Sequence, residues 1–198
     1  MGQNSIRENL TKEDIIADIR LTLAADFEHK KSIVIVEGED DVTFFNGKLA
    51  PDVDLHESFS GKIGVEEIVN SFSDDRVIGI CDKDYDPIAR NPRIYYYDYC
   101  CLEMMLISDD SAFNNYCYGY YRGSKKPLTL REELLRDLAS LSLYRKLSAE
   151  QGWAINFKGI DFGKAFDKNT GKLNSASIVA QIKTINSADS ELIRTQLS

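Results

Sequence analysis

The chain has 198 residues, of which 43% are hydrophobic and 28% are charged, and its formal net charge is -8. These values are typical of a soluble globular protein and argue against a disordered or fibrous chain. No apolar run approaches the ~20 residues of a membrane span and the first residues are polar, so we expect a cytoplasmic protein with no membrane partner. The 32 acids against 24 Lys and Arg disfavour a nucleic-acid binder at first sight, but carboxylates gathered to hold metal ions also raise the acid count.

Helices and strands alternate through the first half of the chain. Apolar, β-branched runs predict strands over residues 32–36, 53–58, 76–81 and 94–97. Apolar residues at helical spacing predict helices over residues 12–29, 40–49, 65–72 and 102–107, with a turn over residues 60–64. The alternation predicts an α/β fold with a mostly parallel sheet flanked by helices, whose ligand crevice lies at the carboxyl ends of the strands.

The second half of the chain is predicted to be mainly helical. Helices are expected over residues 129–145, 175–185 and 189–197, with one more strand over residues 153–157. The stretch Gly-Ser-Lys-Lys-Pro at 123–127 is the best candidate for a boundary. We therefore expect a core with an N-terminal helix over residues 1–125 and a helical C-terminal lobe over residues 126–198.

Two of the predicted strands end in acidic residues. IVIVEGEDD brings Glu37 to the end of the first strand, and ICDKDYD brings Asp82 and Asp84 to the end of another. Because parallel strands end at the same rim of a sheet, these carboxylates are expected to lie together, with Asp82 and Asp84 on one side of an extended segment. Carboxylates in such a place either bind hard cations such as Mg²⁺ or Mn²⁺, or act as general acid and base.

Not every acid after a strand has a chemical role. Glu39, Asp40 and Asp41 follow Glu37 closely and suit the first turn of a helix, where the helix dipole favours negative charge. A structural role is the favoured interpretation for these three acids, although Asp41 is kept as a candidate metal ligand.

Basic and aromatic residues supply weaker candidates for substrate contacts. Lys62 either stabilises charge on a scissile phosphate or is an exposed lysine. Tyrosines gather over residues 95–99 and 116–121, followed by Arg122, Lys125 and Lys126. These tyrosines either stack on unpaired bases beside a basic strip or fill partly buried core positions.

The order IVEGEDDVTFF, ICDKDYD and YYYDYCCLEMML resembles the TOPRIM domain of topoisomerases, primases and OLD-family nucleases over about residues 30–107. It is most similar to an OLD-like branch that includes the effector nucleases of PARIS-type phage-defence systems. The resemblance implies that Glu37 is the catalytic glutamate and that Asp82 and Asp84 bind metal. Asp98 and Glu103 fall where this branch has further acids, and Glu103 is a candidate metal ligand; Cys101 stands where another acid is expected, and a thiol is a poor ligand for Mg²⁺.

The leading hypothesis is therefore a Mg²⁺- or Mn²⁺-dependent nuclease acting on RNA such as tRNA, or on DNA. The resemblance implies an ABC-type ATPase partner, a role in antiphage defence and a homodimer. The alternative is a non-catalytic binding module that docks a partner ATPase or holds a metal ion structurally.

Overall fold

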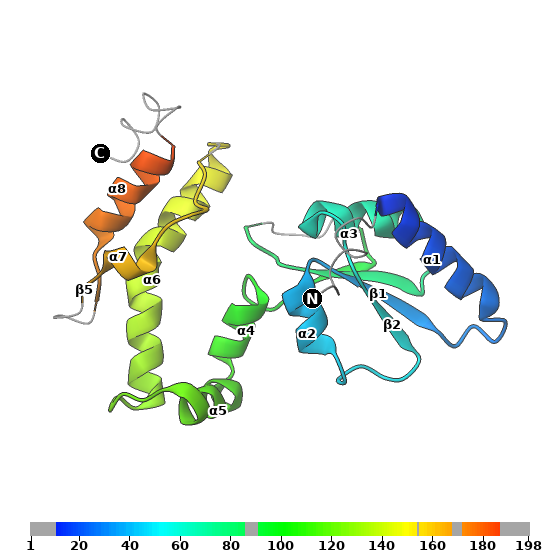
Figure 1. Cartoon of the computed structure of the whole chain (residues 1–198), viewed down its shortest axis with the longest axis horizontal. Coiled ribbons are helices and arrows are strands. Elements are labelled where there is room, and N and C mark those ends of the chain that lie inside the picture. Colours follow the sequence, from blue (N-terminus) through cyan, green and yellow to red (C-terminus); the bar gives the residue numbers. More distant parts are fainter. Residues whose placement is uncertain (1–10, 86–90, 154, 168–171, 187–198) are drawn as a thin grey trace, which may run out of the picture. The chain divides into compact units, whose positions relative to one another are not determined.

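The computed structural model describes residues 11–85, 91–153, 155–167 and 172–186 (Figure 1). The chain divides into two compact units, residues 1–109 (unit 1) and residues 110–198 (unit 2). The sequence predicts a boundary at residues 125 and 126, whereas this division lies between Asp109 and Asp110. The difference arises because the helix that follows Asp109 packs on the helix of the next segment, where the Arg131 guanidinium lies 5.6 Å from the Phe113 ring.

Unit 1 is built on a four-stranded sheet whose strands all run parallel. The strands are β1 (Ser32–Val36), β2 (Val53–Glu57), β3 (Val77–Cys81) and β4 (Ile94–Tyr96), in the order β2-β1-β3-β4. The predicted α/β class with a parallel sheet flanked by helices is confirmed. β1 and β3 are neighbours, so residues that follow these two strands emerge side by side.

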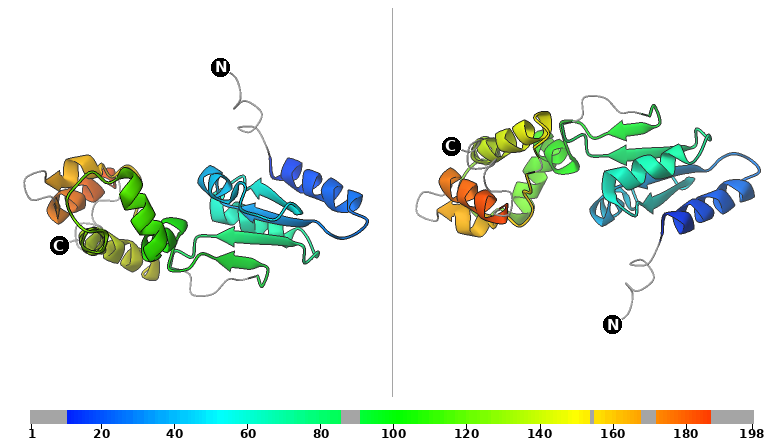
Figure 2. Two further views of the ribbon diagram at one scale, coloured as in Figure 1. Left: turned by 90° about the horizontal axis from the view of Figure 1, so that it is seen from below. Right: turned by 90° about the horizontal axis from the view of Figure 1, so that it is seen from above.

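Helices cover the sheet and close the core of unit 1. They are α1 (Lys12–Ala25), α2 (Glu39–Phe45), α3 (Gly61–Asn70) and α4 (Leu102–Ser108). α1 and α3 pack on one face of the sheet (Figure 2), where Ile19, Ile35, Val65 and Ile68 are fully buried. Val34 points to the opposite face of β1 and is also buried, which explains the continuous apolar run of this strand.

The helix α3 begins four residues earlier than the sequence predicts. The two glycines at 61 and 64 indicate a turn, but only Gly61 has the left-handed backbone, with φ of +52°. Gly64 lies inside the helix against Ser58, where a Cβ atom would be 3.0 Å from the hydroxyl oxygen. The glycines therefore bring the start of α3 close to the end of β2.

Unit 2 is mainly helical, as predicted. It contains α5 (Asp110–Tyr120), α6 (Pro127–Glu150), α7 (Phe162–Ala165), the antiparallel pair β5 (Phe166–Asp167) and β6 (Lys172–Leu173), and α8 (Ser175–Ile185). Its core is formed by Leu141, Ala165, Ile178 and Ile182. The α5 helix and the β5–β6 pair are not anticipated by the sequence pattern, and the predicted helix over residues 189–197 lies outside the described residues.

The strand predicted over residues 153–157 is wrong. Residues 153 and 155–157 belong to no strand, and the backbone of Asn156 bonds to a side chain instead of a neighbouring strand. Its N–H donates to Asn186 Oδ1 at 2.7 Å, and its carbonyl accepts from Asn186 Nδ2 at 2.8 Å. A side chain thus satisfies the backbone groups that a sheet ladder would otherwise pair.

In the part of the chain that the structure describes, none of the helices is both long and apolar enough to cross a membrane.

Candidate acidic site at the sheet edge

Glu37 and Asp82 meet across the ends of two neighbouring strands. Glu37 follows β1 directly and Asp82 follows β3 directly. The backbone N–H of Asp82 donates to Glu37 Oε1 at 2.6 Å, a short bond of the kind expected for a charged acceptor. The proximity of these two acids, predicted from the strand ends, is confirmed.

Asp84 joins the same region through a turn rather than through an extended segment. Its φ is +49°, in the left-handed region that Asp tolerates better than most residues. Its N–H donates to the carbonyl of Cys100 at 3.0 Å, which ties this turn to the loop after β4. The alternation expected for Asp82 and Asp84 on an extended strand is therefore replaced by a tight turn at Asp84.

Lys62 contacts the same loop from α3. Its Nζ donates to the carbonyls of Asp82 at 3.0 Å and Lys83 at 3.3 Å, and lies 3.8 Å from Asp84 Oδ2. The ammonium group also lies 4.6 Å from the centre of the Tyr96 ring. With a side chain that is 17% exposed, Lys62 is not the exposed lysine of the alternative interpretation. We call Glu37, Asp82, Asp84 and Lys62 the acidic site.

Two acids of this site, Glu37 and Asp82, have raised pKa values. Burial, followed by the charges of Glu37 and Asp84, raises the pKa of Asp82 to about 6. Burial also raises the pKa of Glu37, and the charges of Asp84 and Asp41 add to this effect, whereas the N–H of Asp82 and the charge of Lys62 oppose it. The site thus carries more negative charge than Lys62 offsets, and it favours either a proton or an added cation.

Asp41 is buried and both of its carboxylate oxygens accept hydrogen bonds within the fold. Oδ2 accepts from the N–H of Gly38 at 3.1 Å, which closes the first turn of α2, and Oδ1 accepts from the Tyr97 hydroxyl at 2.7 Å. The Tyr97 ring stacks on Phe45 with centroids 6.3 Å apart. These bonds match the structural interpretation of Asp41, and they fix the segment that follows Glu37.

Glu103 is exposed in the first turn of α4. Its charge adds to the rise in the pKa of Asp82, whereas the N–H of Leu102 donates to the Asp82 carboxylate and opposes that rise. Burial, with contributions from Glu103 and Cys100, raises the pKa of Cys101 to about 12, so this thiol stays protonated at neutral pH. A protonated thiol is not a ligand for a hard cation.

The donor atoms of the acidic site fit a hard divalent cation in kind but do not enclose one. Glu37, Asp82 and Asp84 offer oxygen ligands, which Mg²⁺ and Mn²⁺ prefer, and their mutual repulsion falls when a cation binds. Among the described residues, however, no three His, Cys, Asp or Glu side chains are grouped so that they could hold a metal ion. One carboxylate oxygen of Glu37 accepts the bond from the Asp82 N–H and is therefore already engaged within the fold.

The remaining predicted contact residues belong to unit 2. Arg122, Lys125 and Lys126 lie in the segment that joins α5 to α6, and all three are exposed. Lys125 forms an ion pair with Glu133. They are thus carried by a different unit from the acids.

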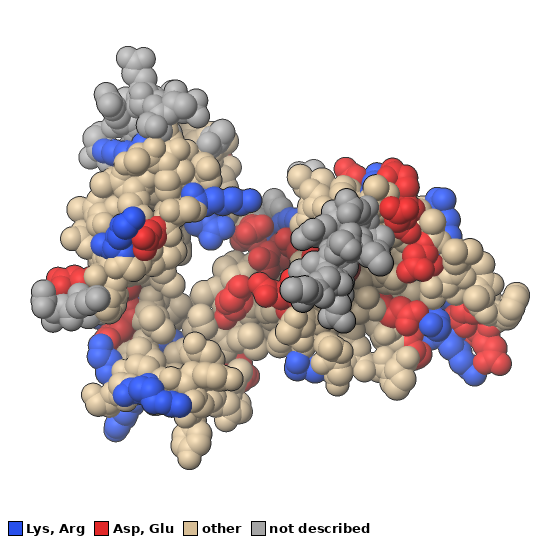
Figure 3. Space-filling model, viewed as in Figure 1, with Lys and Arg blue, Asp and Glu red and all other residues tan. Residues whose placement is uncertain are grey.

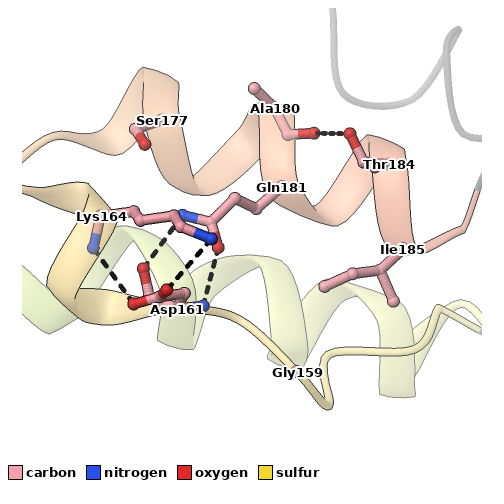
Figure 4. A pocket seen from close by; sticks show the side chains of 8 residues that line it. All are labelled: Gly159, Asp161, Lys164, Ser177, Ala180, Gln181, Thr184 and Ile185. Carbon is pink, nitrogen blue, oxygen red and sulfur yellow. Dashed lines mark hydrogen bonds and ion pairs between the residues drawn. The ribbon is translucent and has the colours of Figure 1, made fainter.

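A pocket lies in unit 2, between α8 and the segment around Asp161 (Figure 4). It has a volume of about 350 Å³. The Asp161 N–H donates to Gln181 Oε1 at 2.7 Å, and Gln181 Nε2 donates to the Asp161 carbonyl at 3.1 Å. These polar groups fasten the loop to α8, so the pocket is explained by the packing of unit 2.

Sequence reasoning missed two features of the acidic site. The contacts of Lys62 with two backbone carbonyls depend on α3 starting at Gly61, and the bond from Tyr97 to Asp41 joins residues 56 positions apart. The only sequence signals were a lysine just after a glycine and a tyrosine at the end of an apolar strand.

Comparisons of the chain with protein-family models, with curated proteins and with solved structures found no match. The function of the chain is therefore inferred from its residues and their geometry.

Proposed function

We propose that the chain is a metal-dependent nuclease with a TOPRIM-like catalytic unit, and that Glu37, Asp82 and Asp84 are its catalytic acids. The observation that supports this most directly is the 2.6 Å bond between Glu37 and Asp82 across two strand ends, together with the raised pKa of both acids. Crowded acids with raised pKa values at the carboxyl edge of a parallel sheet are typical of functional sites.

Each residue has a distinct role in this proposal. Asp82 and Asp84 would hold a Mg²⁺ or Mn²⁺ ion, which would supply Lewis acidity toward a scissile phosphate and toward water. Glu37, whose pKa is raised by burial, accepts the proton of the attacking water or serves as a further ligand of the ion. Lys62, whose Nζ lies 3.8 Å from Asp84 Oδ2, supplies positive charge for the phosphate.

The order of the sequence motifs supports the wider part of the proposal. The resemblance to the OLD-like branch favours RNA such as tRNA, or DNA, as the substrate, an ABC-type ATPase as the controlling partner, and a role in antiphage defence as a homodimer. An acidic unit 1 also suits a partner with a basic surface.

The test is cleavage by the full chain of tRNA, single-stranded DNA and plasmid DNA, in Mg²⁺ or Mn²⁺ and in EDTA. We expect cleavage that EDTA abolishes and that Glu37→Gln lowers by about 100-fold or more, as for loss of a general base. The matched control is Asp40→Asn, which removes an exposed acid three residues away, in the first turn of α2, and should leave the rate unchanged. Cleavage by Glu37→Gln at the wild-type rate would contradict the assignment.

A second candidate function is a binding module that cleaves nothing. It is favoured by two observations: Lys62 already provides a cation beside Asp84, and the described acids do not enclose a metal ion. The two functions differ in the response to Mg²⁺. A catalytic site should bind Mg²⁺ or Mn²⁺ in calorimetric titration and lose it in Asp82→Asn, whereas a module that docks a partner should keep that partner, cleave nothing and show no such titration.

A further inference from the structure

The charge of the chain is divided unevenly between its two units. Unit 1 contains 23 Asp and Glu against 11 Lys and Arg, a formal charge of -12. Unit 2 contains 13 Lys and Arg against 9 Asp and Glu, a formal charge of +4. The positive charge of unit 2, against the strongly negative charge of unit 1, favours unit 2 as the part of the chain that contacts a polyanion.

The α5 helix of unit 2 exposes tyrosine rings to an unusual degree. It packs through Phe113 and Cys117, which are buried, while Tyr116, Tyr118 and Tyr120 are 61%, 93% and 74% exposed. Three large aromatic side chains on one helix of 11 residues gain little from burial in this fold. Exposed rings of this kind suit a partner that stacks on their faces.

Two of these rings form a preassembled pair. Tyr116 and Tyr120 are four residues apart, so they lie on the same side of the helix, and their ring centroids are 5.3 Å apart with a 35° tilt. Tyr118 lies about 200° around the helix from Tyr116 and on the opposite side. We call Tyr116 and Tyr120 the tyrosine pair.

Basic residues follow the tyrosine pair directly. The segment 121–126, which we call the basic loop, carries Arg122, Lys125 and Lys126, all exposed. Figure 3 shows Lys and Arg side chains gathered around the corner where α5 passes into α6. Lys125 pairs with Glu133 on α6, which keeps its charge beside the start of that helix.

We propose that the tyrosine pair and the basic loop bind single-stranded nucleic acid, with bases stacked on Tyr116 and Tyr120 and phosphates held by Arg122, Lys125 and Lys126. This inference deepens the proposed nuclease function, on which it rests for its biological purpose, by naming unpaired nucleotides as the substrate class. Ring faces beside a cationic strip are the combination that binds single strands without sequence preference. Bases in a duplex are already stacked and offer no faces to the tyrosines.

The other occupants fit less well. An acidic protein surface, such as unit 1 of a second copy, is complementary to the basic loop in charge. It provides carboxylates for Arg and Lys and some exposed rings, such as Phe27 and Tyr99, but a single strand supplies both a phosphate and a ring face with every nucleotide. Unpaired nucleic acid is therefore the occupant to test.

The experiment measures binding of a fluorescent 20-nucleotide oligo(U) to the full chain by anisotropy, in EDTA so that no cleavage occurs, beside a duplex of the same length. We expect preference for the single strand, and weakening of at least about fivefold for Tyr116→Ala and again for Tyr120→Ala, because one stacked base contributes ~1–3 kcal/mol. The matched control is Tyr118→Ala, on the same helix but on its other side, which should bind as the wild type does. Tyr116→Phe should also bind as wild type, since it keeps the ring.

The role of the basic loop is tested by the salt dependence of binding. Log affinity falls as log salt rises. Changing both Lys125 and Lys126 to Gln should make this fall less steep, by roughly 0.7 in slope for each phosphate that a lysine no longer neutralises. Equal binding by Tyr116→Ala and wild type, equal binding of duplex and single strand, or a salt slope unchanged in the Gln variants would overturn the proposal. So would a tyrosine variant that converts a dimer to a monomer in sedimentation, because the pair would then be a contact between copies.

Failure of this inference is separate from failure of the nuclease proposal. Binding in EDTA tests only the tyrosine pair and the basic loop, whereas the loss of cleavage in Glu37→Gln tests only the acidic site. Circular dichroism of each variant confirms its fold, and Tyr116→Phe remains informative even if Tyr116→Ala does not fold.

Discussion

At the scale of single residues, the raised pKa of Asp82 is the property of the acidic site that affects stability. Asp82 is half-buried beside Glu37 and Asp84, and its ionised form is therefore less stable in the folded chain than in the unfolded chain. A carboxyl whose pKa is raised on folding holds its proton more tightly in the native state, so ionisation destabilises the fold. The destabilisation is absent below the unfolded pKa and complete above the folded value of about 6.

Because ionisation of Asp82 destabilises the fold, replacing this residue should change how stability depends on pH. In EDTA, Asp82→Asn should gain thermal stability relative to wild type as the pH rises from about 3 to 7, because only the wild type acquires the destabilising negative charge of an ionised Asp82. The two chains should be closest in stability near pH 3, below the ordinary Asp pKa of 3.8, where Asp82 is mostly protonated in both states. The measurement is the difference in Tm across this pH range; a difference that does not change with pH would contradict the raised pKa.

A bound cation should stabilise the acidic site, because it offsets the repulsion between Asp82 and its acidic neighbours. Addition of Mg²⁺ at pH 7 offsets the repulsion among the acids, so the wild type should gain Tm in Mg²⁺ more than Asp82→Asn does. This comparison belongs to the metal test of the proposed function and uses the same two proteins.

At the scale of elements, the packing of α3 on the sheet fixes the position of Lys62. Gly79 lies in the middle of β3 under α3, where a Cβ atom would come within 2.5 Å of Val65 Cγ1 and 3.2 Å of Val69 Cγ2. Both valines are fully buried, so they have little room to move. The absence of a side chain at Gly79 thus allows α3 to lie close to the sheet.

We therefore expect Gly79→Ala to lower the free energy of unfolding by about 1–3 kcal/mol, as overpacking of a core does. The matched control is Gly119→Ala in α5, where no atom lies within 4 Å of the new Cβ. Alanine there should be neutral or stabilising by up to about 1 kcal/mol, because it favours the helix. Urea unfolding of both variants decides the matter, and equal stability of Gly79→Ala and wild type would show that α3 can shift.

The elements predicted from sequence are those whose apolar pattern matches their packing. β1 has the predicted bounds because both of its faces are buried, and α8 has them because Asn174 caps it and one apolar face meets α6. The α5 helix escapes prediction because its buried residues, Phe113 and Cys117, are few and its tyrosines are exposed. Its stability comes from contacts with α6 that no local pattern reveals.

The acidic site was predictable only in part. The meeting of Glu37 and Asp82 follows from strand order, and the structure confirms it. The left-handed turn at Asp84 and the place of Lys62 depend on tertiary contacts, with Cys100 in one case and with backbone carbonyls in the other. The chemical roles of these residues stay predictions.

At the scale of the whole molecule, the main electrostatic feature is that unit 1 carries a formal charge of -12. Like charges on a compact unit repel one another, and salt screens this repulsion with a Debye length of about 10 Å at 0.1 M. Ion pairs such as Arg76 with Asp26 and Asp74 oppose this repulsion, but the 23 acids of unit 1 outnumber its 11 Lys and Arg.

We therefore expect Tm at pH 7.5 to rise when NaCl is increased from about 0.02 M to about 0.5 M. The rise should be smaller near pH 4.5, where part of the carboxylates are protonated and the net charge of unit 1 is lower. Differential scanning calorimetry in EDTA measures both values. A Tm that falls with salt at pH 7.5 would mean that ion pairs outweigh the repulsion.

The strand order also determines when the acidic site first exists. β1 is the first strand to be synthesised, yet it lies between β2 and β3, so it cannot be fully paired until β3 has been made. Glu37 meets its partner Asp82 only after 45 further residues have been added to the chain. A chain still on the ribosome therefore carries Glu37 without the rest of the acidic site, which forms only after unit 1 has left the exit tunnel and folded.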